Sequence, residues 1–144
     1  MAPSTPLECA SKIVDFNRTT LSVVLDPTCT TAAVVDNLGR ILLVDVATLT
    51  AVRMWKGYRD AQCVWVEAIQ DENDAAASNN ESSARPIRKR TSFLAIYAPR
   101  RGLLELWQAR HGKRINAYSV GPDCQLISVV VWYFCVLCRF FFTC

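Results

Sequence analysis

Two successive sets of short apolar runs, each ended by residues that favour turns, constrain the fold of this chain most strongly. Short runs of Val, Ile, Leu and aromatic residues without helical spacing are typical of β-strands. The first set covers residues 21–25, 31–35, 40–46 and 51–55, and the second covers 62–69, 92–98, 103–107 and 114–120. The chain is therefore predicted to be all-β, with two four-stranded meanders.

The turns between these runs agree with the strand prediction. Asp26-Pro27 ends the first run, and Gly39 precedes the third run of the first set. In the second set, Gly102 takes the same place after Pro99-Arg100-Arg101. Proline restricts φ, and glycine adopts positive φ without a steric penalty, so these residues favour tight connections.

The two sets align with each other at one offset. Residues 33–45 lie against 96–108, which places Gly39 on Gly102 and Trp55 on Tyr118. Without an insertion in the second set, the repeat has roughly the forty residues of a propeller blade. The residues therefore predict a partial β-propeller of two WD-like four-stranded blades, with an unrelated β-sandwich meander as the alternative.

The composition divides the chain into regions. Residues 1–20 are predicted to be a flexible N-terminus, and residues 21–126 the propeller region. Within it, residues 70–91 are predicted to be a disordered insertion, because a polar and alanine-rich stretch buries too little apolar surface to offset its ordering entropy. Residues 127–144 form a divergent apolar tail, in which Arg139 is the only charged residue.

The net charge of +3 is too small to indicate nucleic-acid binding. Its distribution is uneven, since residues 60–81 carry six acids and no base, whereas 85–114 carry nine bases and one acid. The first twenty residues lack the apolar core of a signal peptide, which favours a reduced, cytoplasmic compartment.

Few residues suggest a chemical site, and neither a cofactor nor a metal is predicted. Cys135 and Cys138 have the spacing of a zinc or redox pair but lack a matching second pair. His111 lies in a predicted turn without a partner nucleophile, so no catalytic residue is predicted. Aromatic and arginine residues concentrate binding energy at interfaces, which makes Trp55, Arg100 and Arg101 candidate interface residues. Core packing is the favoured role of Trp65 and Trp107.

Three stretches also carry a family resemblance: residues 39–47, 53–62 (RMWKGYRDAQ) and 97–107 (YAPRRGLLELW). They closely resemble the N-terminal region of the regulatory, non-catalytic subunit of the Rab-3 GTPase-activating protein complex. The resemblance implies a cytoplasmic, propeller-containing protein of vesicle traffic that pairs with a catalytic subunit and regulates Rab GTPases, Rab-3 and Rab-18 among them. It implies that GTPase activation resides in the partner subunit.

The resemblance stops at Ile127, so the chain is expected to be a truncated fragment of that regulatory subunit. Two alternatives remain. The apolar tail could anchor a small membrane protein or give a cytoplasmic protein peripheral membrane contact, because residues 126–142 span seventeen residues, the lower limit for a membrane-crossing helix, although Arg139 lies among them. The blades could also form a WD-like scaffold of another complex.

Overall fold

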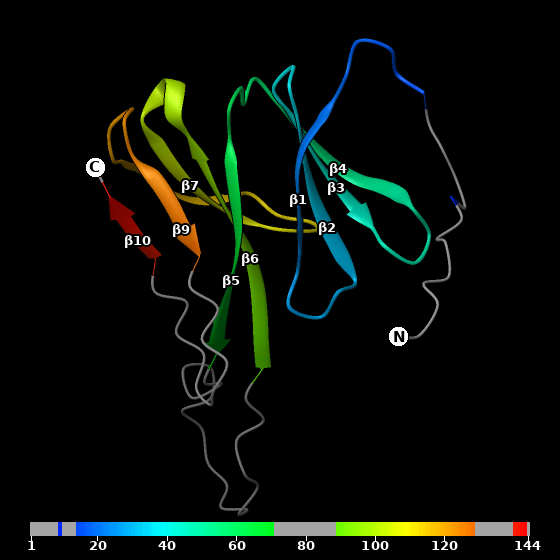
Figure 1. The fold of residues 1–144 in the computed structure, drawn as a ribbon. Helices are drawn as coiled ribbons and strands as arrows, with labels where there is room; N and C mark the ends of the chain where they lie inside the picture. Colours follow the sequence, from blue (N-terminus) through cyan, green and yellow to red (C-terminus); the bar gives the residue numbers. More distant parts are fainter. Residues whose placement is uncertain (1–8, 10–13, 71–88, 129–139, 144) are drawn as a thin grey trace, which may run out of the picture.

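The computed structural model describes residues 9, 14–70, 89–128 and 140–143, which form three antiparallel sheets (Figure 1). The first sheet contains β1 (Thr20–Leu25), β2 (Thr31–Asp36), β3 (Arg40–Asp45) and β4 (Thr50–Lys56). The second contains β5 (Gln62–Gln70), β6 (Lys89–Ala98), β7 (Leu103–Gln108) and β8 (Arg114–Ser119). The third pairs β9 (Gln125–Ser128) with β10 (Phe140–Thr143), and a short 3₁₀ turn, η2 (Pro99–Arg101), joins β6 to β7.

All eight predicted strands are present, and each four-stranded sheet is a meander in chain order. The all-β prediction with two blade-like sheets is therefore confirmed. The strand bounds differ most at β6, which begins at Lys89 instead of Ser92 because Lys89–Thr91 continue the ladder with β5. Residues 71–88, the rest of the predicted insertion, lie outside the described residues.

The two sheets repeat each other closely, but not at one offset. Ile41 pairs with Trp55 and Leu104 with Tyr118, an offset of 63 residues for the third and fourth strands. The irregularity between Leu43 and Val44 recurs at the same offset in β7. Equivalent positions of the second strands, β2 and β6, are 62 residues apart, because Val35 pairs with Ile41 whereas Tyr97 pairs with Leu104. The constant offset expected for residues 33–45 is therefore wrong by one residue in this strand, since the turn before β7 is one residue longer.

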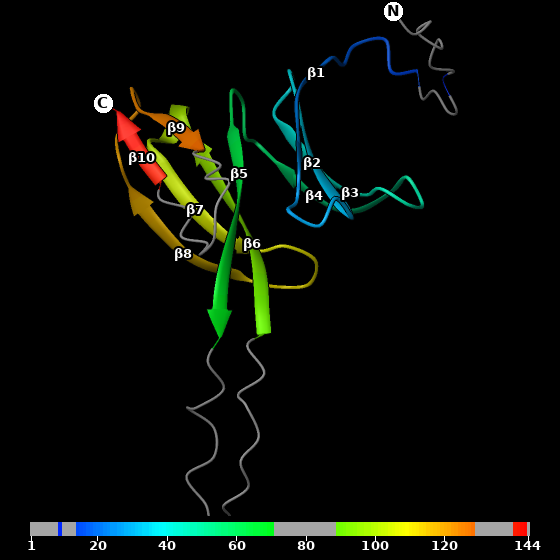
Figure 2. The same cartoon turned by 60° about the horizontal axis from the view of Figure 1, so that its bottom comes forward.

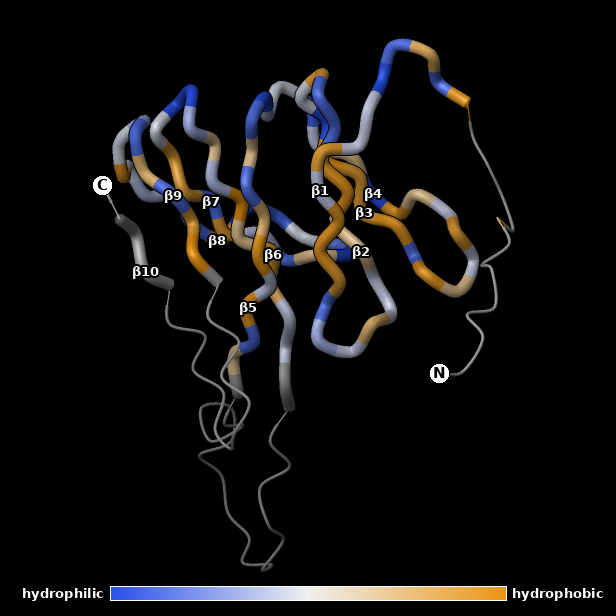
Figure 3. The backbone as a smooth tube through the Cα atoms, in the orientation of Figure 1, coloured by the Kyte–Doolittle hydropathy of each residue, from blue (hydrophilic) through white to orange (hydrophobic). Residues whose placement is uncertain are grey.

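The sheets pack face to face, as the two views of the cartoon show (Figures 1 and 2). One face of each sheet fills the core between them, and the strands that carry these faces are the most apolar parts of the tube in Figure 3. Burying each large aliphatic side chain contributes roughly 1.5–3 kcal/mol. The residues at the centre of this core are Ala33, Val35, Ile41 and Leu43 in the first sheet and Leu94, Ile96 and Ala98 in the second.

Gly39 and Gly102 determine how the chain leaves each sheet. Both have positive φ, 85° and 60°, and the carbonyl oxygen of each accepts a backbone hydrogen bond from the linker that follows the sheet. The linker donors are Tyr58 N, at 2.9 Å, and Gly121 N, at 3.2 Å, which are again 63 residues apart. A Cβ on Gly39 would lie 2.9 Å from the backbone nitrogen of Arg59, and a Cβ on Gly102 would lie 2.9 Å from the carbonyl carbon of Gly121. Only glycine therefore fits at these two positions.

The strand β9 follows the second sheet as β5 follows the first, and it packs against β5. The backbone N–H of Leu126 donates a hydrogen bond to the side-chain oxygen of Gln62 at 2.6 Å. The predicted apolar tail thus begins inside a strand, since Ile127 and Ser128 belong to β9, and residues 129–139 and 144 lie outside the described residues. No helix in the described part of the chain has the length and apolar character needed to cross a membrane.

Ion pairs connect part of the predicted flexible N-terminus to the first sheet. The side chain of Arg18 lies 2.7 Å from that of Asp15 and 3.3 Å from that of Asp36 at the end of β2. Arg40 bridges the same two carboxylates, at 3.7 and 2.7 Å. Residues 14–19 therefore approach β1 in a defined path.

Candidate functional site

The polar centre of the joint between the sheets is the carboxylate of Glu105 in β7, which is 1% exposed. Three donors surround it: the hydroxyl of Tyr58, the indole N–H of Trp107 at 3.1 Å and the guanidinium of Arg114 at 2.9 Å. Tyr58 belongs to the linker between β4 and β5, so its hydrogen bond ties that linker to the second sheet. A buried carboxylate needs such donors, and hydrogen bonds to a charged group are stronger than neutral ones.

The hydrogen bonds keep Glu105 ionised. Burial alone would raise the pKa of this carboxyl, but the bonds from Tyr58, Trp107 and Arg114 outweigh burial and hold the pKa below its ordinary value. Burial, followed by the bond to Glu105 and its charge, raises the pKa of Tyr58 to about 12. At neutral pH the pair is therefore a carboxylate and a neutral phenol, an arrangement suited to holding two elements together.

Trp55 lies beside this cluster, inside the joint, and is 5% exposed. Its ring meets that of Trp107 edge to face, with centroids 5.9 Å apart. The guanidinium of Arg53 lies 4.6 Å from the Trp55 centroid and 4.9 Å from the Trp107 centroid, and it donates to the carbonyl of Gln108 at 3.0 Å. Trp55 thus packs one sheet on the other, and contact with a partner protein would require this joint to open.

Arg100 and Arg101, the other two predicted interface residues, lie at the surface in η2. Arg100 forms an ion pair with Asp60 at 2.8 Å, and both side chains are more than half exposed. Arg101 donates to the carbonyl of Gly57 at 2.9 Å and stacks over the Tyr58 ring at 4.4 Å. With the exposed Lys56 at the end of β4 and the exposed Arg59 in the adjoining linker, these arginines form a positively charged edge, which we call the basic rim (Lys56, Arg59, Arg100, Arg101).

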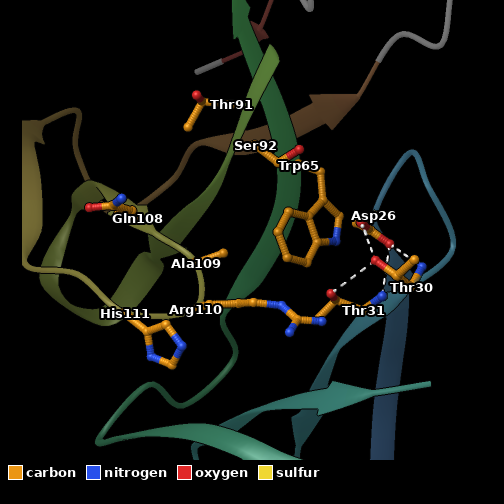
Figure 4. Close-up of a pocket in the computed structure, with 10 residues that line it drawn as sticks. All are labelled: Asp26, Thr30, Thr31, Trp65, Thr91, Ser92, Gln108, Ala109, Arg110 and His111. Atoms are coloured by element: carbon orange, nitrogen blue, oxygen red, sulfur yellow. Dashed lines mark hydrogen bonds between the residues drawn. The ribbon is translucent and has the colours of Figure 1, made fainter. Parts of the chain in front are cut away.

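A pocket of about 310 Å³ opens near the opposite ends of the strands, between the β1–β2 turn and the β7–β8 turn (Figure 4). The Trp65 indole lies within it and donates to the carbonyl of Val24 at 2.9 Å. Arg110 forms an ion pair with Asp45 at 3.0 Å. The exposed His111 lies at the edge of the pocket, in the turn where it was predicted. The pocket is lined by Asp26, Thr30, Thr31, Trp65, Thr91, Ser92, Gln108, Ala109, Arg110 and His111.

The acid in this pocket serves the turn in which it lies. One carboxylate oxygen of Asp26 accepts the backbone N–H groups of Thr30 and Thr31, at 2.7 and 2.9 Å. The other accepts the hydroxyls of Thr28 and Thr30. Burial would raise the pKa of Asp26, but these bonds lower it overall, so the carboxylate stabilises the turn and is a poor proton acceptor.

Among the described residues, His, Cys, Asp and Glu side chains do not gather in threes in a way that could hold a metal ion. The Cys135 and Cys138 pair lies outside those residues. Cys63 is described, and burial raises the pKa of its thiol to about 12. Its thiolate, the reactive form, is therefore scarce at neutral pH.

The predicted site residues are only partly brought together. Arg100 and Arg101 share the basic rim, whereas Trp55 lies in the joint. Sequence reasoning missed Glu105 and Tyr58, although one signal was present: Glu105 is the only acid among the nine bases of residues 85–114, and it lies within an apolar strand.

Acid is expected to destabilise the fold through three carboxylates. The pKa values of Asp26, Asp36 and Glu105 lie below their ordinary values of 3.8 for Asp and 4.5 for Glu, because their hydrogen bonds outweigh burial. The stability they contribute is therefore fully present above about pH 5 and is lost as the pH falls through the folded-state values. Urea midpoints measured between about pH 7 and pH 3 should fall with pH.

The matched control for the measurement of urea midpoints against pH is Asp36→Asn, which removes one of these titrating groups. It should make the urea midpoint less sensitive to pH below about pH 5. A midpoint of the unmodified chain that stays constant over this range would show that these hydrogen bonds do not stabilise the fold.

Comparison with known proteins finds one family. Residues 1–127 match the family described as "Rab3 GTPase-activating protein regulatory subunit N-terminus". A relative from Caenorhabditis elegans, the Rab3 GTPase-activating protein regulatory subunit, is 32% identical over 117 residues. That alignment includes 81% of this chain but only 8% of the worm protein, so the chain spans a small part of the relative's length. No solved structure matches the chain.

Proposed function

Because this chain belongs to the family of Rab3 GTPase-activating protein regulatory subunits, we propose that it is a non-catalytic binding module of a Rab GTPase-activating complex. The match over residues 1–127 carries this proposal, since it includes both four-stranded sheets. The partners are the catalytic subunit of the complex and, through it, Rab GTPases such as Rab-3 and Rab-18. The setting is vesicle traffic at the cytoplasmic side of membranes.

The chemistry of GTPase activation fits this division of labour. An activating protein commonly supplies an arginine in trans, which stabilises charge on the transferring phosphoryl group. Three of the described arginines have structural partners: Arg53 lies against two indoles, Arg101 covers Tyr58, and Arg114 pairs with Glu105. These structural roles, together with the relatives' description as regulatory subunits, support assigning the activating arginine to the catalytic subunit and a docking role to this chain.

The basic rim is the surface that we assign to the catalytic subunit. It presents Arg100 with a 61% exposed side chain, and Asp60 is the acid that balances it. A surface of one charge steers association with a surface of opposite charge. Arginine is also enriched among the residues that contribute most of the binding energy at interfaces. The partner surface is therefore expected to be acidic.

Charge reversal at the rim tests this assignment. The purified chain should bind the purified catalytic subunit, and Arg100→Glu should slow association by about tenfold, with a smaller effect at high salt. Lys113→Glu is the matched control, because Lys113 is exposed but lies in the β7–β8 turn and not in the rim. Association rates measured by biolayer interferometry at two salt concentrations provide the comparison.

The outcomes separate the functional classes. Acceleration of GTP hydrolysis on Rab-3 or Rab-18 by the chain alone would contradict a non-catalytic role. If the catalytic subunit is not bound at all, the blades are instead a scaffold of another complex. A carbonate-resistant membrane pool of the chain would favour the tail-anchored alternative over peripheral contact.

A further inference from the structure

The strand β6 extends beyond its neighbour β7. Its ladder with β5 reaches Lys89, whereas its ladder with β7 stops at Phe93, which pairs with Gln108. Figure 2 shows β5 and β6 continuing together past the end of β7. In the described part of the chain, residues 89–92 therefore pair with β5 alone, and no strand pairs with their other edge. Such a free edge presents backbone N–H and C=O groups to which another strand can bind.

The pocket between the β1–β2 and β7–β8 turns lies at this free edge, since Thr91 and Ser92 line it. Ser92 is on the face of β6 that packs in the joint, because side chains alternate along a strand and Leu94 belongs to the core of the joint. Trp65 pairs with Leu94, so its indole lies on the same face, beside Ser92 (Figure 4). A residue of an added strand opposite Ser92 would share this face and enter the pocket beside Trp65.

Arg110 makes the pocket suited to an acidic ligand. Its side chain is half exposed and extends across the pocket, below the Trp65 ring (Figure 4). Nη2 pairs with Asp45 at 3.0 Å, but Nε and Nη1 donate to no residue in the part of the chain that the structure describes. These two N–H groups are available to the carboxylate of a ligand, and a hydrogen bond between two charged groups is stronger than a neutral one.

The acids near the pocket do not occupy this position. The carboxylate of Asp26 accepts four hydrogen bonds within its own turn. Glu67 pairs with Ser92 in the ladder of β5 and β6 but does not line the pocket. The strand with the free edge is itself basic, because β6 opens with Lys89 and Arg90. Charge complementarity therefore favours an acidic occupant.

We propose that the free edge of β6 and this pocket bind an extended acidic segment of a partner protein. The segment adds a strand beside residues 89–92, in line with β7, and one of its carboxylates binds Arg110. Strand addition of this kind draws affinity from main-chain hydrogen bonds and specificity from pockets for alternate side chains. Both elements are present here at one place, whereas a free anion would bind Arg110 and leave the strand edge unpaired.

The site is separate from the surface assigned to the catalytic subunit. The pocket lies at the β7–β8 turn, whereas the arginines of the basic rim lie in η2, before β7 begins. The inference therefore goes beyond the proposed function and does not depend on it. A pocket of about 310 Å³ is at the lower end of the range for ligand sites, so it fits side chains of a peptide and not a folded domain.

The first test uses an oriented library of short, end-blocked peptides that are degenerate at every position. The purified chain should select Asp or Glu at one position, flanked by β-branched residues, which favour extended backbone. Arg110→Gln should lower the enrichment of acid at that position by at least about tenfold. Because the ion pair of Arg110 with Asp45 is partly exposed, this replacement should change stability little.

Two control variants locate the selection. Lys113→Gln should retain it, because Lys113 is exposed in the same turn but does not line the pocket. Arg100→Glu, in the basic rim, should retain it as well. Loss of the selection in Arg100→Glu would assign the acid to the rim and overturn this inference while leaving the proposed function intact.

The second test asks whether the peptide binds as a strand. A selected peptide is remade in two forms, each N-methylated at alternate backbone amides. The form whose methyl groups replace the N–H groups that face β6 should bind at least about tenfold more weakly, and the other form should bind as the parent peptide does. Fluorescence anisotropy of the labelled peptides measures both affinities.

The remaining outcomes each contradict the proposal. A library without enrichment of acid would overturn it, and so would an enrichment that survives Arg110→Gln. Equal affinity of the two methylated forms would show that the peptide does not add as a strand. Displacement of the peptide by inorganic phosphate as effectively as by unlabelled peptide would make a free anion the occupant.

Discussion

Replacing Glu105 by alanine is expected to lower the free energy of unfolding by about 3 kcal/mol, as breaking a buried charged network does. The substitution leaves the buried Tyr58 hydroxyl and the partly buried Trp107 indole N–H without their acceptor, while the half-exposed Arg114 can turn to water. The linker at Tyr58 then loses its bond to the second sheet. Urea denaturation followed by tryptophan fluorescence measures the loss.

Two further variants show whether the charge or the shape of Glu105 matters. Glu105→Gln keeps the volume and one acceptor oxygen, so it should recover part of the lost stability. Asp60→Ala removes a carboxylate from an exposed pair with Arg100 and should change stability by less than about 0.5 kcal/mol. A loss for Glu105→Ala no larger than that for Asp60→Ala would mean that the cluster does not hold the joint.

Trp55→Ala is expected to cost about 3–5 kcal/mol, the range for deleting a buried large aromatic side chain. The substitution opens a cavity beside Trp107 and removes one of the two rings that hold the Arg53 guanidinium. The whole chain should therefore unfold at a lower urea concentration, before any effect on partner binding can be assessed. Equilibrium unfolding is the measurement.

The counterpart of Trp55 in the second sheet supplies the control. Tyr118 lies at the same position of the last strand and is 51% exposed, so Tyr118→Ala should cost far less. If Trp55→Ala leaves stability unchanged and weakens binding of a partner, the indole belongs to an interface and the joint described here is not its main role.

The strands were predictable because alternation and turn chemistry are local properties. Asp26-Pro27, Gly39 and Gly102 mark the turns in the sequence, and the structure has turns at each of them. The alignment of the two sheets was predictable to within one residue. The remaining error is the offset of β6 relative to β2. The turn before β7 has one residue more than the turn before β3, and this residue precedes Gly102, so an alignment of Gly39 with Gly102 shifts the strand before the turn by one position.

The joint was much harder to predict, because it depends on which faces of two sheets meet. Tryptophan is common at protein interfaces, which made Trp55 a candidate interface residue. A tryptophan that packs between two sheets of one protein cannot be distinguished from it in the sequence. The role of Tyr58 depends on a partner 47 residues away, at Glu105. No local pattern links a tyrosine in a linker to an acid in a strand of the next sheet.

The β4–β5 linker lies at the same end of the strands as the β2–β3 and β6–β7 turns, which contain Gly39 and Gly102, whereas β5 ends and β6 begins at the opposite end (Figure 1). At the linker end, each sheet is positioned by bonds to the sheet before it, so a change of length there would shift every sheet that follows. At the other end, the β5–β6 connection joins two strands already paired from Gln62 to Gln70. That end can gain or lose residues between related proteins while the order and spacing of the sheets stay the same.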